Sequence, residues 1–141
     1  MVTFINTEDY IMIGTSALEI VQQADAGNRE NAEKEAIEEV AGYLRGRYDV
    51  DAIFSATGEE RNKVIVMRCC DVALYHLVSS RNQRQGMEIR KERYERAIKW
   101  LEDVQKGNIM PDLPTPVGPD GEQDILNPIR FGSERKNSYG W

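Results

Sequence analysis

The sequence predicts an all-α protein, a small helical bundle of three to five helices followed by a long extended C-terminal arm. Two observations lead to this fold class. Apolar residues recur at helical spacing through long segments before residue 107. All five prolines lie after residue 110, where they prevent regular helices. The expected organisation is therefore a helical body at 1–107 and a Pro-rich arm at 108–141.

The first helices are expected to be short. Asn6 or Thr7 is a suitable N-cap for a helix that Gly14 ends. A second helix begins directly after this glycine and runs to about Ala24.

A longer helix is predicted from Asn28 to Tyr48, because apolar side chains return every three or four residues. Its main apolar stripe consists of Ala32, Ala36, Val40, Tyr43 and Leu44. The same helix carries an acidic run, which we interpret as a solvent-exposed face. That run comprises Glu30, Glu33, Glu35, Glu38 and Glu39.

Residues 49–58 are expected to form a loop, with one turn at DAIF. Two further long helices follow at about 60–80 and 87–106, joined by the polar segment SRNQRQG. Gly107 is a suitable C-cap for the last of them, since glycine tolerates the left-handed conformation found there.

Residues 68–78 read RCCDVALYHLV and hold both cysteines and the only histidine of the chain. On a helix, Cys69 and His76 share a face but lie about 10.5 Å apart along the axis. Cys70 and His76 lie on different sides, so neither pair can converge on a metal ion or act as nucleophile and base. The apolar residues of this helix are distributed around its whole circumference, which indicates that it is buried in the core. We therefore expect no catalytic residue, no metal site and no cofactor, with both thiols acting as small apolar groups.

The remaining polar residues of this helix share one narrow sector. Arg68, Asp71 and Tyr75 stand at positions i, i+3 and i+7, so we predict an ion pair between Arg68 and Asp71 with the Tyr75 ring alongside. Two interpretations remain open for these residues, and the first is favoured. The pair is a structural bridge within the chain, or it is an anchor pointing into a neighbouring subunit.

Composition limits the class of function. The net charge of −6 disfavours a protein that grips nucleic-acid phosphates. No apolar run approaches the roughly 20 residues of a membrane helix, and the N-terminal residues lack the pattern of a signal peptide. The expected setting is cytosolic and reducing, without a membrane partner.

The arm contains apolar side chains that a solvated tail does not need. They are Ile125, Leu126, Ile129, Phe131, Tyr139 and Trp141. One interpretation is a mobile terminus. The other is an arm that becomes ordered on a neighbouring subunit, with Phe131, Tyr139 and Trp141 as interface candidates because large aromatics dominate interface energetics.

Three segments of the helical body carry motifs of fixed spacing. The first follows the pattern R-x-x-D-[apolar]-A-x-Y and is matched by Arg68, Asp71, Ala73 and Tyr75. The second follows R-Y-x-x-A-[apolar]-x-W-L and is matched by Arg93, Tyr94, Ala97, Trp100 and Leu101. The third is a Tyr-Leu-x-x-Arg-Tyr helix end, matched by Tyr43, Leu44, Arg47 and Tyr48. Together these segments resemble the Mu-like prophage family of small virion proteins, and the resemblance covers residues 28–114.

This resemblance implies a head-to-tail connector (adaptor, or head completion protein) of tailed phages, without catalysis. Such proteins form a homo-oligomeric ring, here expected to be twelve-fold, between the portal protein and the tail or neck proteins. The DNA passes through the channel without specific binding. The implied location is the virion neck, after assembly in the host cytoplasm.

The leading alternative function is a small phage-encoded helical regulatory or DNA-binding adaptor protein. The acidic charge and the lack of a basic recognition helix disfavour it. An enzyme ranks third, because the cysteines and the histidine do not converge.

Overall fold

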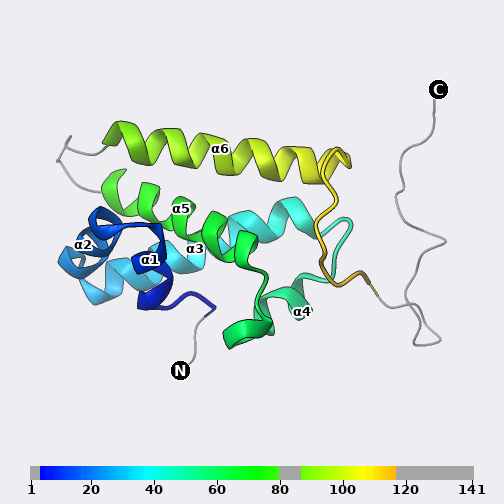
Figure 1. Cartoon of the computed structure of the whole chain (residues 1–141), viewed down its shortest axis with the longest axis horizontal. Helices are drawn as coiled ribbons and strands as arrows, with labels where there is room; N and C mark the ends of the chain where they lie inside the picture. Colours follow the sequence, from blue (N-terminus) through cyan, green and yellow to red (C-terminus); the bar gives the residue numbers. More distant parts are fainter. Residues whose placement is uncertain (1–3, 80–86, 117–141) are drawn as a thin grey trace.

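Six α-helices and one 3-10 turn follow one another along residues 4–79 and 87–116, the part of the chain that the computed structural model describes (Figure 1). They are α1 (Thr7–Ile13), α2 (Thr15–Gln23), α3 (Ala26–Leu44), α4 (Val50–Ser55), η1 (Gly58–Glu60), α5 (Lys63–Ser79) and α6 (Met87–Lys106). The all-α fold class is confirmed. The described part holds more helices than the expected three to five, because α4 replaces most of the expected loop. The Asp49 side chain caps α4 by accepting a hydrogen bond from the Ala52 amide at 3.2 Å.

Helix α5 is the centre of the bundle and packs against α1, α2, α3 and α6. Figure 1 shows α6 running antiparallel to α5 along one side, with α1 and α2 at one end and α4 near the other. The side chains that α5 buries are Ile65, Val66, Cys69, Cys70, Asp71, Val72, Ala73, Leu74, Leu77 and Val78. This confirms the prediction of a core helix. None of the helices in the described ranges is both long and apolar enough to cross a membrane.

The start of the bundle follows the capping residues of the sequence. The Asn6 side chain accepts a hydrogen bond from the Asp9 amide at 3.1 Å, and the Asp9 carboxylate accepts one from the Asn6 amide at 2.8 Å. This reciprocal pair satisfies amides that a helix leaves unbonded at its first turn. Gly14 has a φ of 152°, a conformation that favours glycine, and it separates α1 from α2 as expected.

The predicted bounds of the third helix were wrong at both ends. Ala24 takes an extended conformation after α2, and α3 then begins at Ala26, with Asp25 as its N-cap, rather than after Asn28. The helix ends at Leu44 rather than at Tyr48. Tyr48 is nevertheless buried, because the turn that follows α3 folds back onto the core.

Residues 108–116, the first part of the expected arm, lie against the helical body. Gly107 ends α6 with a φ of 86°, in the left-handed region. The Asp49 amide then donates a hydrogen bond to the Pro114 carbonyl at 2.9 Å, and the Leu113 side chain is buried. Residues 117–141 lie outside the described residues, so the arm beyond Pro116 stays a prediction.

Arg61 joins the N-terminal segment to the residues that precede α5. Its guanidinium donates hydrogen bonds to both Asp9 carboxylate oxygens, at 2.6 and 3.1 Å. It also donates to the Phe4 carbonyl at 2.7 Å and to the Gly58 carbonyl at 2.9 Å. One side chain thus joins two segments that lie 52 to 57 residues apart in the sequence.

Replacing this arginine, as Arg61→Met, is expected to lower the free energy of unfolding by about 2 kcal/mol, because a largely buried Asp9 carboxylate loses its bidentate partner. The measurement is urea unfolding. Arg45→Met is the matched control, because Arg45 pairs with the exposed Glu38 at 3.3 Å. This substitution is expected to cost less than about 0.5 kcal/mol. Equal losses in the two variants would contradict the structural role of Arg61.

Candidate functional site

Both cysteines of α5 are buried in the core, as predicted. Burial raises the pKa of the Cys69 thiol well above its ordinary value. Burial is also the main cause of the raised pKa of Cys70, to which the neighbouring Cys69 and nearby carboxylates add. Both groups are therefore neutral thiols at neutral pH. Within the described ranges, no cluster of three or more His, Cys, Asp or Glu side chains is arranged to hold a metal ion.

The buried thiols are expected to make stability fall at alkaline pH. Their pKa values are higher in the folded chain than in the unfolded one, so their contribution is fully present below about pH 8.5 and is lost as the pH rises. Each thiol then adds a slope of about −1.4 kcal/mol per pH unit. The double variant Cys69→Ala/Cys70→Ala should lose about 1 kcal/mol or more per site at pH 7, yet show a shallower slope between about pH 9 and 10.5.

Urea unfolding midpoints measured from pH 7 to 10.5 give both slopes. Identical slopes in the parent and the double variant would show that the thiols are accessible to solvent. Particle assembly is expected to survive the double substitution, because both thiols are buried in the core and cannot contact a neighbouring subunit.

The predicted ion pair between Arg68 and Asp71 was wrong. Asp71 is 1% exposed, and its partner is Arg93 of α6, whose Nε lies 2.7 Å from Oδ1 and whose Nη2 lies 3.4 Å from Oδ2. Asp71 thus forms a bridge within the chain, as in the favoured interpretation, but with Arg93 instead of Arg68. The bond joins the two central helices, and Arg93 was known from the sequence only as part of a family pattern.

Arg68 and Tyr75 have aromatic neighbours on α6. The Arg68 guanidinium lies 5.3 Å from the centre of the Trp100 ring, a distance at which a cation is attracted to the ring face. The Tyr75 ring stacks on Tyr94 with a centroid distance of 4.2 Å. The structure therefore turns Arg68, Asp71 and Tyr75 toward α6, as one narrow sector of α5, but each has its own partner on α6 and the predicted Arg68–Asp71 pair does not form.

Glu39 connects the three long helices. Its Oε1 lies 3.1 Å from His76 Nε2 of α5, and its Oε2 accepts a hydrogen bond from the Tyr94 hydroxyl of α6 at 2.8 Å. Burial raises the pKa of Tyr94 above its ordinary value, and the hydrogen bond to Glu39 raises it further. Glu39 is therefore part of the helix packing and not of a freely solvated face.

Glu33 was also predicted to be solvent-exposed, and this prediction was wrong. It is buried, accepts a hydrogen bond from the Tyr10 hydroxyl at 2.6 Å and pairs with Arg29 at 3.1 Å. Burial is the largest cause of the strongly raised pKa of Tyr10, which keeps this hydroxyl a donor. The spacing of Glu33 from Ala36 and Val40, three and seven residues away, placed it on the buried stripe and was the available signal.

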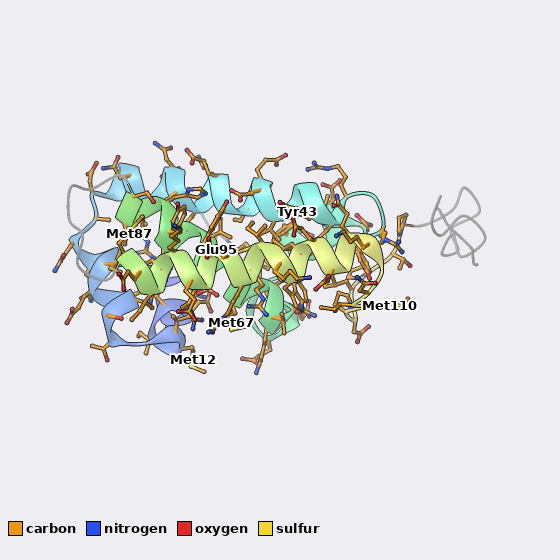
Figure 2. The ribbon with its side chains drawn as sticks, turned by 90° about the horizontal axis from the view of Figure 1, so that it is seen from above. Met12, Tyr43, Met67, Met87, Glu95 and Met110 are labelled. Carbon is orange, nitrogen blue, oxygen red and sulfur yellow. The ribbon has the colours of Figure 1, made fainter. Side chains whose placement is uncertain are left out.

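Exposed apolar side chains mark two other parts of the surface. Ile11 and Met12 are adjacent on α1 and are 53% and 86% exposed, and Met110 is 80% exposed. Figure 2 shows Met12 at the edge formed by α1 and Met110 beyond the end of α6. The sequence predicted no role for these residues. The predicted interface candidates Phe131, Tyr139 and Trp141 lie outside the described residues.

Comparison with known proteins gives one family. A family model described as Bacteriophage Mu, Gp36 matches residues 2–125 of the chain. No curated protein and no solved structure matches.

Proposed function

Because the chain belongs to the Bacteriophage Mu Gp36 family, we propose that it is a structural virion protein, a head-to-tail connector (adaptor) subunit without catalysis. The family match is the observation that carries this proposal. It covers residues 2–125, most of the chain, and identifies it as a phage protein. In the proposed assembly, copies form a ring between the portal protein and the tail, and DNA passes through its channel. The twelve-fold symmetry and the position in the virion neck come from the resemblance described above.

The surface supports a role in protein assembly. A ring made by one kind of subunit needs two different patches on each copy, one for each neighbour. The exposed pair Ile11 and Met12 on α1, and Met110 after α6, are separated on the body and are apolar enough to take part in such contacts (Figure 2).

The charge supports passage of DNA rather than its specific binding. The net charge is −6, and several basic side chains are already paired with acids of the same chain. These pairs include Arg29 with Glu33, Lys34 with Glu30, Arg61 with Asp9 and Lys99 with Asp103. Neutralised cations add little to phosphate binding, which disfavours the alternative of a small DNA-binding regulator.

Electron microscopy tests the proposal directly. Images of the purified full-length protein, and of virions labelled with an antibody against it, are expected to show rings and a label at the neck. A DNA-binding titration at two salt concentrations addresses the alternative, and is expected to show no affinity above that of a non-specific acidic control protein. A label absent from the neck, together with salt-dependent DNA binding, would replace the connector proposal with the regulator.

A further inference from the structure

The seam between α5 and α6 holds more positive than negative charge. Asp71 is its buried carboxylate, and Arg68, Arg90 and Arg93 all act electrostatically on it. Only Arg93 forms an ion pair with Asp71 among the described residues. We call Arg68, Arg90 and Arg93, together with Trp100, the arginine flank.

Two guanidinium groups of this flank have buried nitrogens without a partner. Arg90 is 6% exposed, and its Nη1 forms no hydrogen bond within the described part of the chain. Arg68 Nε is likewise buried and without a partner there. Leaving a charged donor unsatisfied costs free energy, so the seam carries a surplus of positive charge that the described residues do not compensate.

The flank is also reachable from outside. The Arg93 side chain is 29% exposed, and Arg68 is half-buried between Trp100 and solvent. Burial lowers the pKa of Arg68, and the positive charge of Arg93 lowers it further, while Asp71 raises it. An additional anion against the outer side of Arg68 and Arg93 would relieve this repulsion.

A carboxylate fits this position better than a nucleic-acid phosphate. Duplex DNA needs several cations spread along a surface, whereas the exposed residues of α6 next to these arginines are of both signs, with Glu92 and Glu95 beside Lys91 and Arg96. Arginine binds carboxylates in a two-pronged geometry, and the flank already holds one carboxylate in this way.

The chain itself presents matching carboxylates on α3. Glu35 and Glu38 are exposed there, turned away from the buried Ala36 and Val40. We call these two residues the acidic face. Glu38 has an exposed contact with Arg45 at 3.3 Å, and such a contact is a weak competitor for a partner's arginine.

The acidic face and the arginine flank of one copy cannot meet each other. Tyr94 of α6 bonds to Glu39 of α3, whereas Arg93 lies about 100° further round α6. Figure 2 shows α3 along one edge of the body and α1 and α2 toward the other, with α6 between them. A contact between the two surfaces therefore requires two copies, joined head to tail.

We propose that the arginine flank binds the carboxylates of the acidic face, Glu35 and Glu38, of a second copy of this chain. The inference rests on the proposed ring and names the contact that closes it. Unlike a symmetric dimer contact, this arrangement leaves one flank and one face free on each pair, so further copies add until a ring closes.

Charge reversal on the full-length protein tests the contact. Sedimentation velocity over a concentration series is measured for the parent, for Arg68→Glu and for Glu35→Arg/Glu38→Arg. Each variant alone is expected to raise the dissociation constant between copies by about tenfold or more. An equimolar mixture of the two variants is expected to associate again, because each then meets the opposite charge on the other. Lys63→Glu is the matched control, since Lys63 is 86% exposed and outside the flank.

Folding is followed separately by thermal melting. The acidic-face variant changes only exposed side chains, so it keeps the test valid if Arg68→Glu fails to fold. At a concentration too low for association, Arg68→Met is expected to melt close to the temperature of the parent, because the cation that it removes is partly desolvated. At higher concentration it is still expected to weaken association. A purely structural Arg68 would instead lower the melting temperature.

The sedimentation results either support or overturn the proposed contact between copies. Association that is unchanged in both reversed variants, or a parent that stays monomeric throughout, would overturn the inference. Loss in each variant and recovery in the mixture would establish it. Antibody labelling of the neck is independent of these results, so a labelled neck with unchanged association would leave the connector proposal in place and remove only this contact.

Discussion

Replacing Arg93 with methionine is expected to lower the free energy of unfolding by about 3 kcal/mol, because the buried Asp71 then loses its ion-pair partner. Desolvation raises the pKa of Asp71 even beside Arg93, whose hydrogen bond and charge act in the opposite direction. Arg68 and Arg90 also lower that pKa and compensate part of the loss. For this reason we expect the lower end of the range found for broken buried pairs.

A double-mutant cycle with Asp71→Asn measures the pair itself. Asn needs no counter-charge, so the double variant should lose clearly less than the sum of the single losses, with a coupling of about 1.5 kcal/mol or more. The matched control is the exposed pair Glu92 and Arg96, also an acid and an arginine, whose coupling should stay below about 0.5 kcal/mol. Urea unfolding at pH 7 gives all the values.

The pH dependence of Arg93→Met provides a second measurement. In this variant Asp71 lacks its main cation, so its pKa should rise further. A carboxyl group whose pKa is raised on folding stabilises the folded chain at pH values below its unfolded-state pKa of about 3.9. This stabilisation is lost as the pH rises. Lowering the pH from 7 toward 4 should therefore narrow the gap between variant and parent. A constant gap, or a coupling equal to the control, would mean that Asp71 is solvated.

The sequence was sufficient for features that depend on a single helix. Apolar residues around the whole of α5 predicted its burial, and Gly14 predicted the break between α1 and α2. Asp49 was a suitable cap for α4, but a six-residue helix has too few positions to show a periodic pattern.

Features that depend on two helices were not predictable in the same way. The choice between Arg68 and Arg93 as the partner of Asp71 depends on the register of α5 against α6. Nothing in a single sequence fixes this register, and the i, i+3 spacing favoured Arg68, the arginine on the same helix, as the partner of Asp71. Glu33 is different, because its position on the buried stripe was visible, whereas its partner Tyr10 lies 23 residues away.

Two truncations are expected to separate the part of the C-terminal segment that stabilises the body from the part proposed to act in assembly. A chain ending at Gly107 should be less stable than the full chain by about 3 kcal/mol. It loses the buried Leu113, worth about 1.5 to 3 kcal/mol, and the hydrogen bond from the Asp49 amide to the Pro114 carbonyl, worth about 1 kcal/mol. A chain ending at Pro116 keeps both and should lose less than about 1 kcal/mol.

Assembly should depend on the arm even where stability does not. If Phe131, Tyr139 or Trp141 anchors the arm on a neighbouring subunit, the chain ending at Pro116 should melt close to the full chain and yet form rings or dock to the portal poorly. Thermal melting and sedimentation of both truncations and the full chain make the comparison. Normal assembly of the chain ending at Pro116 would exclude the arm from the contact and leave the charged surfaces of α3, α5 and α6 to hold the ring. An unfolded chain ending at Pro116 would show instead that the arm's apolar residues are buried on their own body, because only then does removing them cost the fold itself.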